Sequence, residues 1–200
     1  MYRIILASES PRRKEIMGIM GIPFETVPSD LPEAVPETKP DEIVKALAAM
    51  KAGNAADKIA GRKGDFLIIG ADTMVFYKDH ALGKPKDEAD AERMLLLLSD
   101  QVHEVCTGVS IIIRKAQEED KSISFAVSTM VTVQPLSLEQ IKDYIMTGEP
   151  MDKAGAYAIQ GKFGIYIKEI NGDYYNVVGF PIAKIHEKLL EQGINIKKLN

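Results

Sequence analysis

The chain has 200 residues, enough to bury a sizeable core, and we expect residues 1–200 to form a single domain. Hydrophobic residues make up 46% of the sequence and charged residues 27%, and the formal net charge of −4 argues against general nucleic-acid binding. One cysteine cannot form an internal disulfide, and no apolar run reaches the ~20 residues of a membrane span, so we expect a cytoplasmic protein with neither a nucleic acid nor a membrane as partner.

The first predicted elements are a short strand over residues 3–7 and a helix from Ser10 to about residue 21. Serine is favoured at helix N-caps, and Pro11 suits the first helical position because its missing N–H would have no partner there. Another short strand is predicted over residues 24–27.

Residues 28–40 hold four prolines among acidic residues, which predicts an ordered acidic loop rather than a helix. Apolar residues at helical spacing then predict a helix over 41–59. The continuous apolar run 66–71 predicts a strand buried on both faces. We expect this strand to end at Asp72, with extended chain resuming over 74–77.

In the second half, helices are predicted over 87–98 and 137–146, the latter because Ser137 and Gln140 have the form of a capping box. Two long strands, 102–113 and 122–133, are predicted on either side of a charged turn. The last third predicts strands over 156–159 and 165–170, a hairpin turn at Asn171-Gly172 and a helix over 181–192 that Gly193 stops. The order of elements indicates a mixed α/β fold.

A candidate anion site lies where the first strand meets the first helix. A helix N-terminus there offers backbone N–H groups and a partial positive charge. Ser8 and Ser10 add hydroxyls, and Arg12, Arg13 and Lys14 add cations. These residues favour a phosphate receptor, with a solvated basic helix face as the alternative. The glycine-rich patterns of P-loops and dinucleotide folds are absent.

Four further residues are candidates, each with a structural alternative. Asp72 follows an apolar strand, where a carboxylate can hold a divalent cation or take a proton from water, or can simply turn the chain. Lys84, between Gly83 and Pro85, suits phosphate, although such a tetrapeptide is also a common surface turn. Lys51 is a weaker cation candidate. The amide of Gln160 can pair with a nucleobase edge or sit in an exposed turn.

Gly161 and Gly164 have the GXXG spacing of an RNA-binding KH loop. That reading is disfavoured because the loop is predicted between strands and the chain is acidic.

A series of short motifs follows one order along nearly the whole chain. They span residues 8–13, 29–33, 47–52, 70–73, 83–85, 103–109, 152–157, 158–161 and 172–181. In residue type and order the series resembles Maf-type nucleoside triphosphate pyrophosphatases. Residues 99–101, Ser-Asp-Gln, depart from the family's more usual Ser-Gly-Arg.

The resemblance implies a mixed β-sheet flanked by helices, in two lobes around a cleft, similar to inosine triphosphate pyrophosphatases. It implies hydrolysis of a nucleoside triphosphate to the monophosphate and pyrophosphate, with Mg²⁺ or Mn²⁺ as cofactor. Residues 158–161 are similar to the branch that acts on dTTP and UTP, and modified pyrimidine nucleotides stay open as substrates.

The resemblance also implies roles for individual residues. Asp72 would be the proton acceptor, and Arg12, Thr73 and Gln160 would set substrate specificity. The metal would face Glu33 and Asp72. The triphosphate would meet a set of hydroxyls and cations: Ser8, Ser10, Arg12, Arg13, Lys51 and Lys84.

Two questions stay open in the sequence. The family's link to septum formation gives an alternative, a protein-binding regulator of cell division that needs no catalysis. A homodimer is compatible with the sequence, but no surface identifies it.

Overall fold

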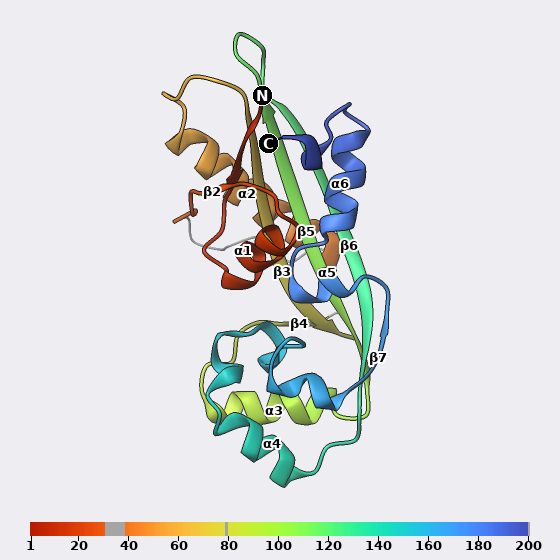
Figure 1. The fold of residues 1–200 in the computed structure, drawn as a ribbon. Helices are drawn as coiled ribbons and strands as arrows, with labels where there is room; N and C mark the ends of the chain where they lie inside the picture. Colours follow the sequence, from red (N-terminus) through yellow and green to blue (C-terminus); the bar gives the residue numbers. More distant parts are fainter. Residues whose placement is uncertain (31–38, 79, 200) are drawn as a thin grey trace.

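The computed structural model describes residues 1–30, 39–78 and 80–199 (Figure 1). Within these ranges the core of the molecule is a seven-stranded sheet of order β2-β1-β3-β5-β6-β7, with β4 paired to β3. The strands are β1 (Arg3–Leu6), β2 (Glu25–Thr26), β3 (Phe66–Tyr77), β4 (His80–Leu82), β5 (Val102–Arg114), β6 (Lys121–Val133) and β7 (Ile167–Asn171). Pairs of β1 with β2 and β3 are parallel and the other pairs are antiparallel, so the sheet is mixed as expected.

Helices gather at the two ends of the long strands and divide the molecule into two lobes (Figure 1). The first lobe holds α1, α2 and α6, and the second holds α3 and α4. The α-helices are α1 (Pro11–Ile19), α2 (Pro40–Lys58), α3 (Glu88–Leu98), α4 (Leu138–Ile145), α5 (Tyr174–Val178) and α6 (Ile182–Leu190). The 3-10 helices are η1 (Glu149–Asp152), η2 (Ala154–Ala156), η3 (Lys162–Tyr166) and η4 (Ile196–Lys198). None of the helices in the described ranges is long and apolar enough to cross a membrane.

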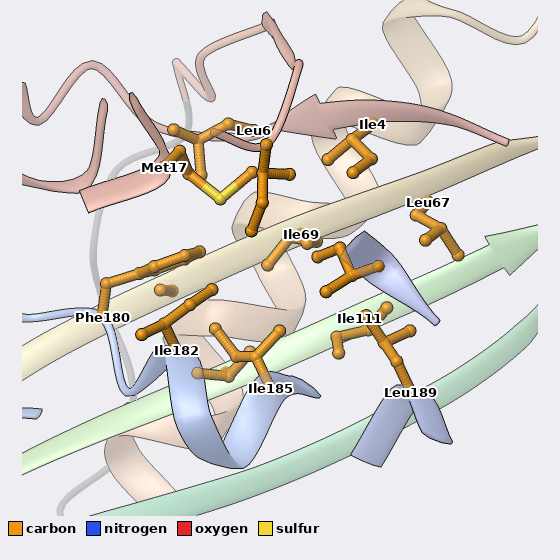
Figure 2. Packing of buried hydrophobic residues seen from close by; sticks show 14 of the residues in the cluster. Ile4, Leu6, Met17, Leu67, Ile69, Ile111, Phe180, Ile182, Ile185 and Leu189 are labelled. Atoms are coloured by element: carbon orange, nitrogen blue, oxygen red, sulfur yellow. The ribbon is translucent and has the colours of Figure 1, made fainter. Parts of the chain in front are cut away.

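Alternation along the central strands sends side chains to both faces of the sheet. Leu6 and Ile69 lie on one face and pack against α1 and α6, where Met17 and Ile185 meet them (Figure 2). The neighbours of Leu6 and Ile69 in sequence point to the opposite face, toward α2. The predicted burial of the 66–71 run on both faces is therefore confirmed.

Two glycines let α2 lie close against the sheet. A Cβ atom at Gly70 would overlap the backbone of Ala48, and one at Gly108 would overlap the backbone of Val44. Both glycines sit in neighbouring strands, β3 and β5, so the helix backbone rests directly on the sheet. This close approach sets how far a side chain from α2 reaches across β3.

The main correction concerns the strand expected to end at Asp72. β3 instead continues without a break from Phe66 to Tyr77, and Asp72 pairs with Gly108 of β5. The partner strand explains the difference, because β5 supplies hydrogen bonds along the full length of β3. Asp72 is thus a mid-strand residue.

The last third also differs from expectation. Residues 156–159 form no strand: Ala156 ends η2, and a turn follows. Gly172 does not close a hairpin, because Asp173 caps α5 by accepting from the Tyr175 amide at 2.8 Å. The GXXG segment lies in a turn and η3, not between two strands. Tertiary contacts, not local propensity, decide these segments.

Candidate functional site

A cleft of about 1030 Å³ lies between the two lobes. It collects nearly all of the residues that the sequence singled out: Ser8, Ser10, Arg12, Arg13, Lys51, Asp72, Thr73, Lys84 and Gln160 all line it. Glu33 lies outside the described residues. Residues far apart in the sequence therefore meet at one place.

The turn between β1 and α1 forms one wall of the cleft. Pro11 is the first residue of α1, as predicted. The buried Ser8 hydroxyl accepts hydrogen bonds from the Ser10 amide at 3.2 Å and from Arg13 Nη1 at 3.0 Å. Ser10 occupies the N-cap position, but its hydroxyl makes no capping hydrogen bond within the described residues. The turn is held by Ser8 instead.

Arg12 and Arg13 differ sharply in environment. Arg13 is only 8% exposed, and it donates from Nε to the carbonyl of Gly179 at 2.9 Å and from Nη2 to Thr73 Oγ1 at 3.2 Å. Arg12 is half-buried and faces the cleft, where its charge helps Lys153 to hold the pKa of Asp152 below its ordinary value. Arg13 thus ties α1 to the sheet, while Arg12 presents charge to the cleft.

Asp72 and Lys51 form an ion pair in the cleft. The distance from Lys51 Nζ to Asp72 Oδ1 is 2.6 Å, and Asp72 is 6% exposed. Lys51 comes from α2, and its reach depends on the close approach that Gly108, opposite Asp72, permits. The pair places a largely buried carboxylate and ammonium side by side at the cleft.

A chain of hydroxyls fixes Thr73. Thr107 Oγ1 donates to the carbonyl of Asn176 at 3.0 Å, so its single proton is used and it accepts from Thr73 Oγ1 at 2.9 Å. Thr73 in turn accepts from Arg13. The buried Asn176 side chain donates to Val105 O and to a further threonine hydroxyl, both at 2.9 Å. β3, β5 and α5 are joined by this network.

Lys84 and Gln160 are exposed on the cleft lining contributed by the second lobe. Gln160 makes no side-chain hydrogen bond to another described residue. The Thr73 hydroxyl is engaged with Arg13 and Thr107 instead.

Two cleft residues had received no role from the sequence. Asp152 and Lys153 form an ion pair and line the cleft, with the Lys153 side chain 14% exposed. The motif over residues 152–157 was the available signal, but it did not indicate where the charges point.

The donor set of the cleft suits a hard divalent cation held together with a substrate. No cluster of three or more histidine, cysteine or acidic residues able to hold a metal exists in the described part of the chain. Mg²⁺ is commonly bound by one or two carboxylates plus substrate phosphates. The carboxylate of Asp72, which lines the same cleft as the hydroxyls of the β1–α1 turn, fits this mode of binding.

Sequence comparison identifies the family. A family model described as Maf-like protein matches residues 3–192. This chain belongs to the Maf family. Among curated Maf relatives, a protein of Lachnoclostridium phytofermentans named dTTP/UTP pyrophosphatase is 47% identical over 198 residues, 99% of each chain. A Bacillus thuringiensis protein of the same name is 44% identical over 197 residues, 98% of each chain.

Solved structures give weaker likenesses to this Maf protein. The Staphylococcus aureus Ham1 protein is 14% identical, with a TM-score of 0.44 over 96% of this chain and 100% of that chain. A dITP/XTP pyrophosphatase from Mycobacterium abscessus is 16% identical, with a TM-score of 0.35 over 67% of this chain and 75% of that chain. Both TM-scores are low.

Proposed function

We propose that this protein hydrolyses dTTP and UTP to the monophosphate and pyrophosphate. Close relatives over the full length carry that activity in their names. The single observation that carries the proposal is the Lys51–Asp72 ion pair, 2.6 Å apart, in a cleft whose wall is a strand-to-helix anion receptor.

The triphosphate would lie along the β1–α1 wall. Phosphoryl transfer depends chiefly on positioning and on neutralising charge. The N-terminus of α1 and Ser10 line the cleft, and the half-buried Arg12 and the exposed Lys84 add cations from its two sides. Ser8 and Arg13 stand behind them: their hydrogen bonds shape the turn, and Arg13 adds a buried positive charge.

Asp72 would act as the general base. Its carboxylate takes a proton from a water molecule whose oxygen attacks the α-phosphorus, and the bond from the α-phosphorus to the bridging oxygen breaks as pyrophosphate leaves. Lys51 keeps the carboxylate in place during this step. General-base assistance is typically worth about two to four orders of magnitude in rate. Preorganised cations in the cleft supply further stabilisation of the transition state.

A divalent cation, Mg²⁺ or Mn²⁺, completes the proposed site. Asp72 would hold it, together with Glu33, whose role rests on the family resemblance. When bound, such an ion neutralises phosphate charge and polarises the oxygens it contacts.

Gln160, with Thr73 and Arg12, would read the base. Its amide can donate to O4 and accept from N3–H of uracil or thymine, which predicts a preference for UTP and dTTP over CTP. The exposed position of Gln160 in the cleft supports this role.

A protein-binding regulator of cell division is the alternative, and it is not favoured, because the relatives' names and the cleft both point to catalysis. A homodimer, a cytoplasmic location and a single domain over residues 1–200 remain proposals from the sequence.

Pyrophosphate release measured across UTP, dTTP and CTP, with added Mg²⁺ or Mn²⁺ and with chelator, tests the proposal. We expect release from UTP and dTTP that needs the metal and exceeds release from CTP. Equal kcat/KM for the three nucleotides would contradict the base preference, and no release from any of them would contradict the enzymatic function. A purely protein-binding role would survive substitution of Asp72.

A further inference from the structure

The carboxylate of Glu149 joins two elements of the second lobe just outside the cleft. Glu149 begins η1 and is partly buried. Its Oε1 accepts a hydrogen bond from the Tyr144 hydroxyl at 2.9 Å, and its Oε2 accepts from the backbone N–H of Lys162 at 3.0 Å. Both oxygens of one carboxylate are therefore used to connect α4 to the start of η3.

The segment that Glu149 holds is the one that carries Gln160. The turn around Gln160 is closed by a hydrogen bond from the Gly161 amide to the Ala158 carbonyl at 3.1 Å. Glu149 binds Lys162, two residues after Gln160, and the Tyr144 hydroxyl interacts with the backbone of Ala158, two residues before it. The Tyr144–Glu149 pair thus contacts both ends of the turn.

Gly161 shows how closely the carboxylate approaches this turn. A Cβ atom at Gly161 would overlap the Glu149 carboxylate. The backbone of Gly161 has φ −104°, which any residue can adopt, so the missing side chain serves the close approach rather than the backbone conformation.

Tyr144 is a rigid support for the carboxylate. It is 3% exposed, and its ring packs against Phe163 with centroids 5.0 Å apart. Burial and the neighbouring Glu149 raise the pKa of Tyr144, so its hydroxyl keeps its proton and donates at neutral pH.

We infer that Glu149, supported by Tyr144, is a positioning residue that sets where Gln160 meets the pyrimidine and thereby the preference for UTP over CTP. The inference rests on the proposed role of Gln160. The Gln160 amide has no hydrogen bond to another described residue, so its placement depends on the backbone that carries it. A turn anchored at both ends costs less to order when the base binds.

Steady-state kinetics with UTP and CTP test the inference in the wild type and in Glu149→Ala, Glu149→Gln and Tyr144→Phe. We expect the ratio of kcat/KM for UTP over CTP to fall about tenfold in Glu149→Ala, mainly through a higher KM for UTP, because a hydrogen bond to a charged group is lost. The ratio should fall less in Glu149→Gln, because the carbonyl of the new amide can still accept a hydrogen bond from one of the two donors.

Tyr166→Phe is the matched control. Tyr166 packs on the same Phe163 ring at 5.4 Å, but its hydroxyl makes no hydrogen bond to another described residue. The ratio should not change in this variant. Gly161→Ala should lower the ratio by pushing the carboxylate aside, and the double variant Glu149→Ala/Gly161→Ala should be no worse than Glu149→Ala alone, because both changes remove one interaction.

The outcomes separate the two proposals. A wild type without a preference, or a preference that survives Gln160→Ala, overturns the role of Gln160 and this inference with it. A preference lost in Gln160→Ala but kept in Glu149→Ala and Tyr144→Phe overturns the inference alone. If kcat/KM falls equally for UTP and CTP in the Glu149 and Tyr144 variants and the melting temperature also falls, the role of Glu149 is merely structural and the inference is overturned.

Discussion

Among single residues of the cleft, some side chains are bonded to other parts of the protein, and others project into the open space of the cleft. Arg13, Thr73 and Asp72 have hydrogen-bond or ion-pair partners on other elements, whereas Arg12 is half-buried and points to the cleft. Adjacent arginines differ in this way because successive helical residues project about 100° apart. Residue types predicted the candidate set, but their partners come from strands far away in sequence.

Asp72→Asn should abolish turnover and leave the fold intact. The amide has nearly the same shape but takes no proton, so we expect kcat to fall ~100-fold or more. Pyrophosphate release and the circular dichroism spectrum measure the two effects. Retention of more than about a tenth of the wild-type rate would remove Asp72 from the role of base, given the size of a general-base contribution.

Arg13→Lys and Arg12→Lys form a matched pair. Lysine cannot reproduce the fork by which Arg13 reaches Ser8, Thr73 and Gly179, so Arg13→Lys should lower the free energy of unfolding by roughly 2 kcal/mol. Arg12→Lys should leave unfolding unchanged, and both should lower kcat/KM for UTP. Urea denaturation checks the first effect, and similar curves for the two variants would contradict it.

At the scale of elements, the position of α2 depends on backbone contact with the sheet. Gly108→Ala places a methyl group into the Val44 backbone, which has no room to move freely, so we expect a loss of about 1–3 kcal/mol and a lower kcat as Lys51 shifts from Asp72. Gly53 lies in α2 itself, with open space around an added Cβ, so Gly53→Ala should instead stabilise the protein by about 0.5–1 kcal/mol. Thermal unfolding of the two variants distinguishes them, and equal effects would mean that packing against β5 is not the cause.

Elements with strong local signals were predicted well. The helix over 137–146 was confirmed together with its capping box, and the apolar run 66–71 proved to be a strand buried on both faces. The errors fall where a distant partner decides. β3 passes through Asp72 because β5 pairs with it along its length. Residues 156–159 form no strand: Ala156 ends η2 with a φ of 61°, and Tyr157, although extended, packs in the second lobe without pairing to the sheet. A single sequence carries little of that information.

At the scale of the whole molecule, one buried histidine couples stability to pH. His103 in β5 is 1% exposed, its Nε2 lies 2.7 Å from the Tyr157 hydroxyl, and burial lowers its pKa from 6.5 to about 4. The unfolded chain therefore binds more protons than the folded chain between these values. The stabilising contribution of neutral His103 to the free energy of unfolding is fully present above pH 6.5 and is lost as pH falls toward 4.

Between pH 7 and pH 5 this contribution should fall by about 2 kcal/mol. The free energy of unfolding of His103→Gln, from urea denaturation at both pH values, should be less pH-dependent than that of the wild type by this amount. The other histidines are present in both proteins and cancel in the comparison. Parallel pH profiles would show that His103 is not the group responsible.

Strands β3, β5 and β6 belong to both lobes (Figure 1). The walls of the cleft are therefore joined by one continuous set of hydrogen-bonded strands, and Asp72 and Thr73 lie partway along β3. The cleft can widen only if these strands bend or twist, and the hydrogen bonds between the strands resist that deformation together. The distance between the β1–α1 turn and the turn that carries Gln160 is therefore set by the sheet when the chain folds, and a nucleotide bound as proposed would have to match that distance.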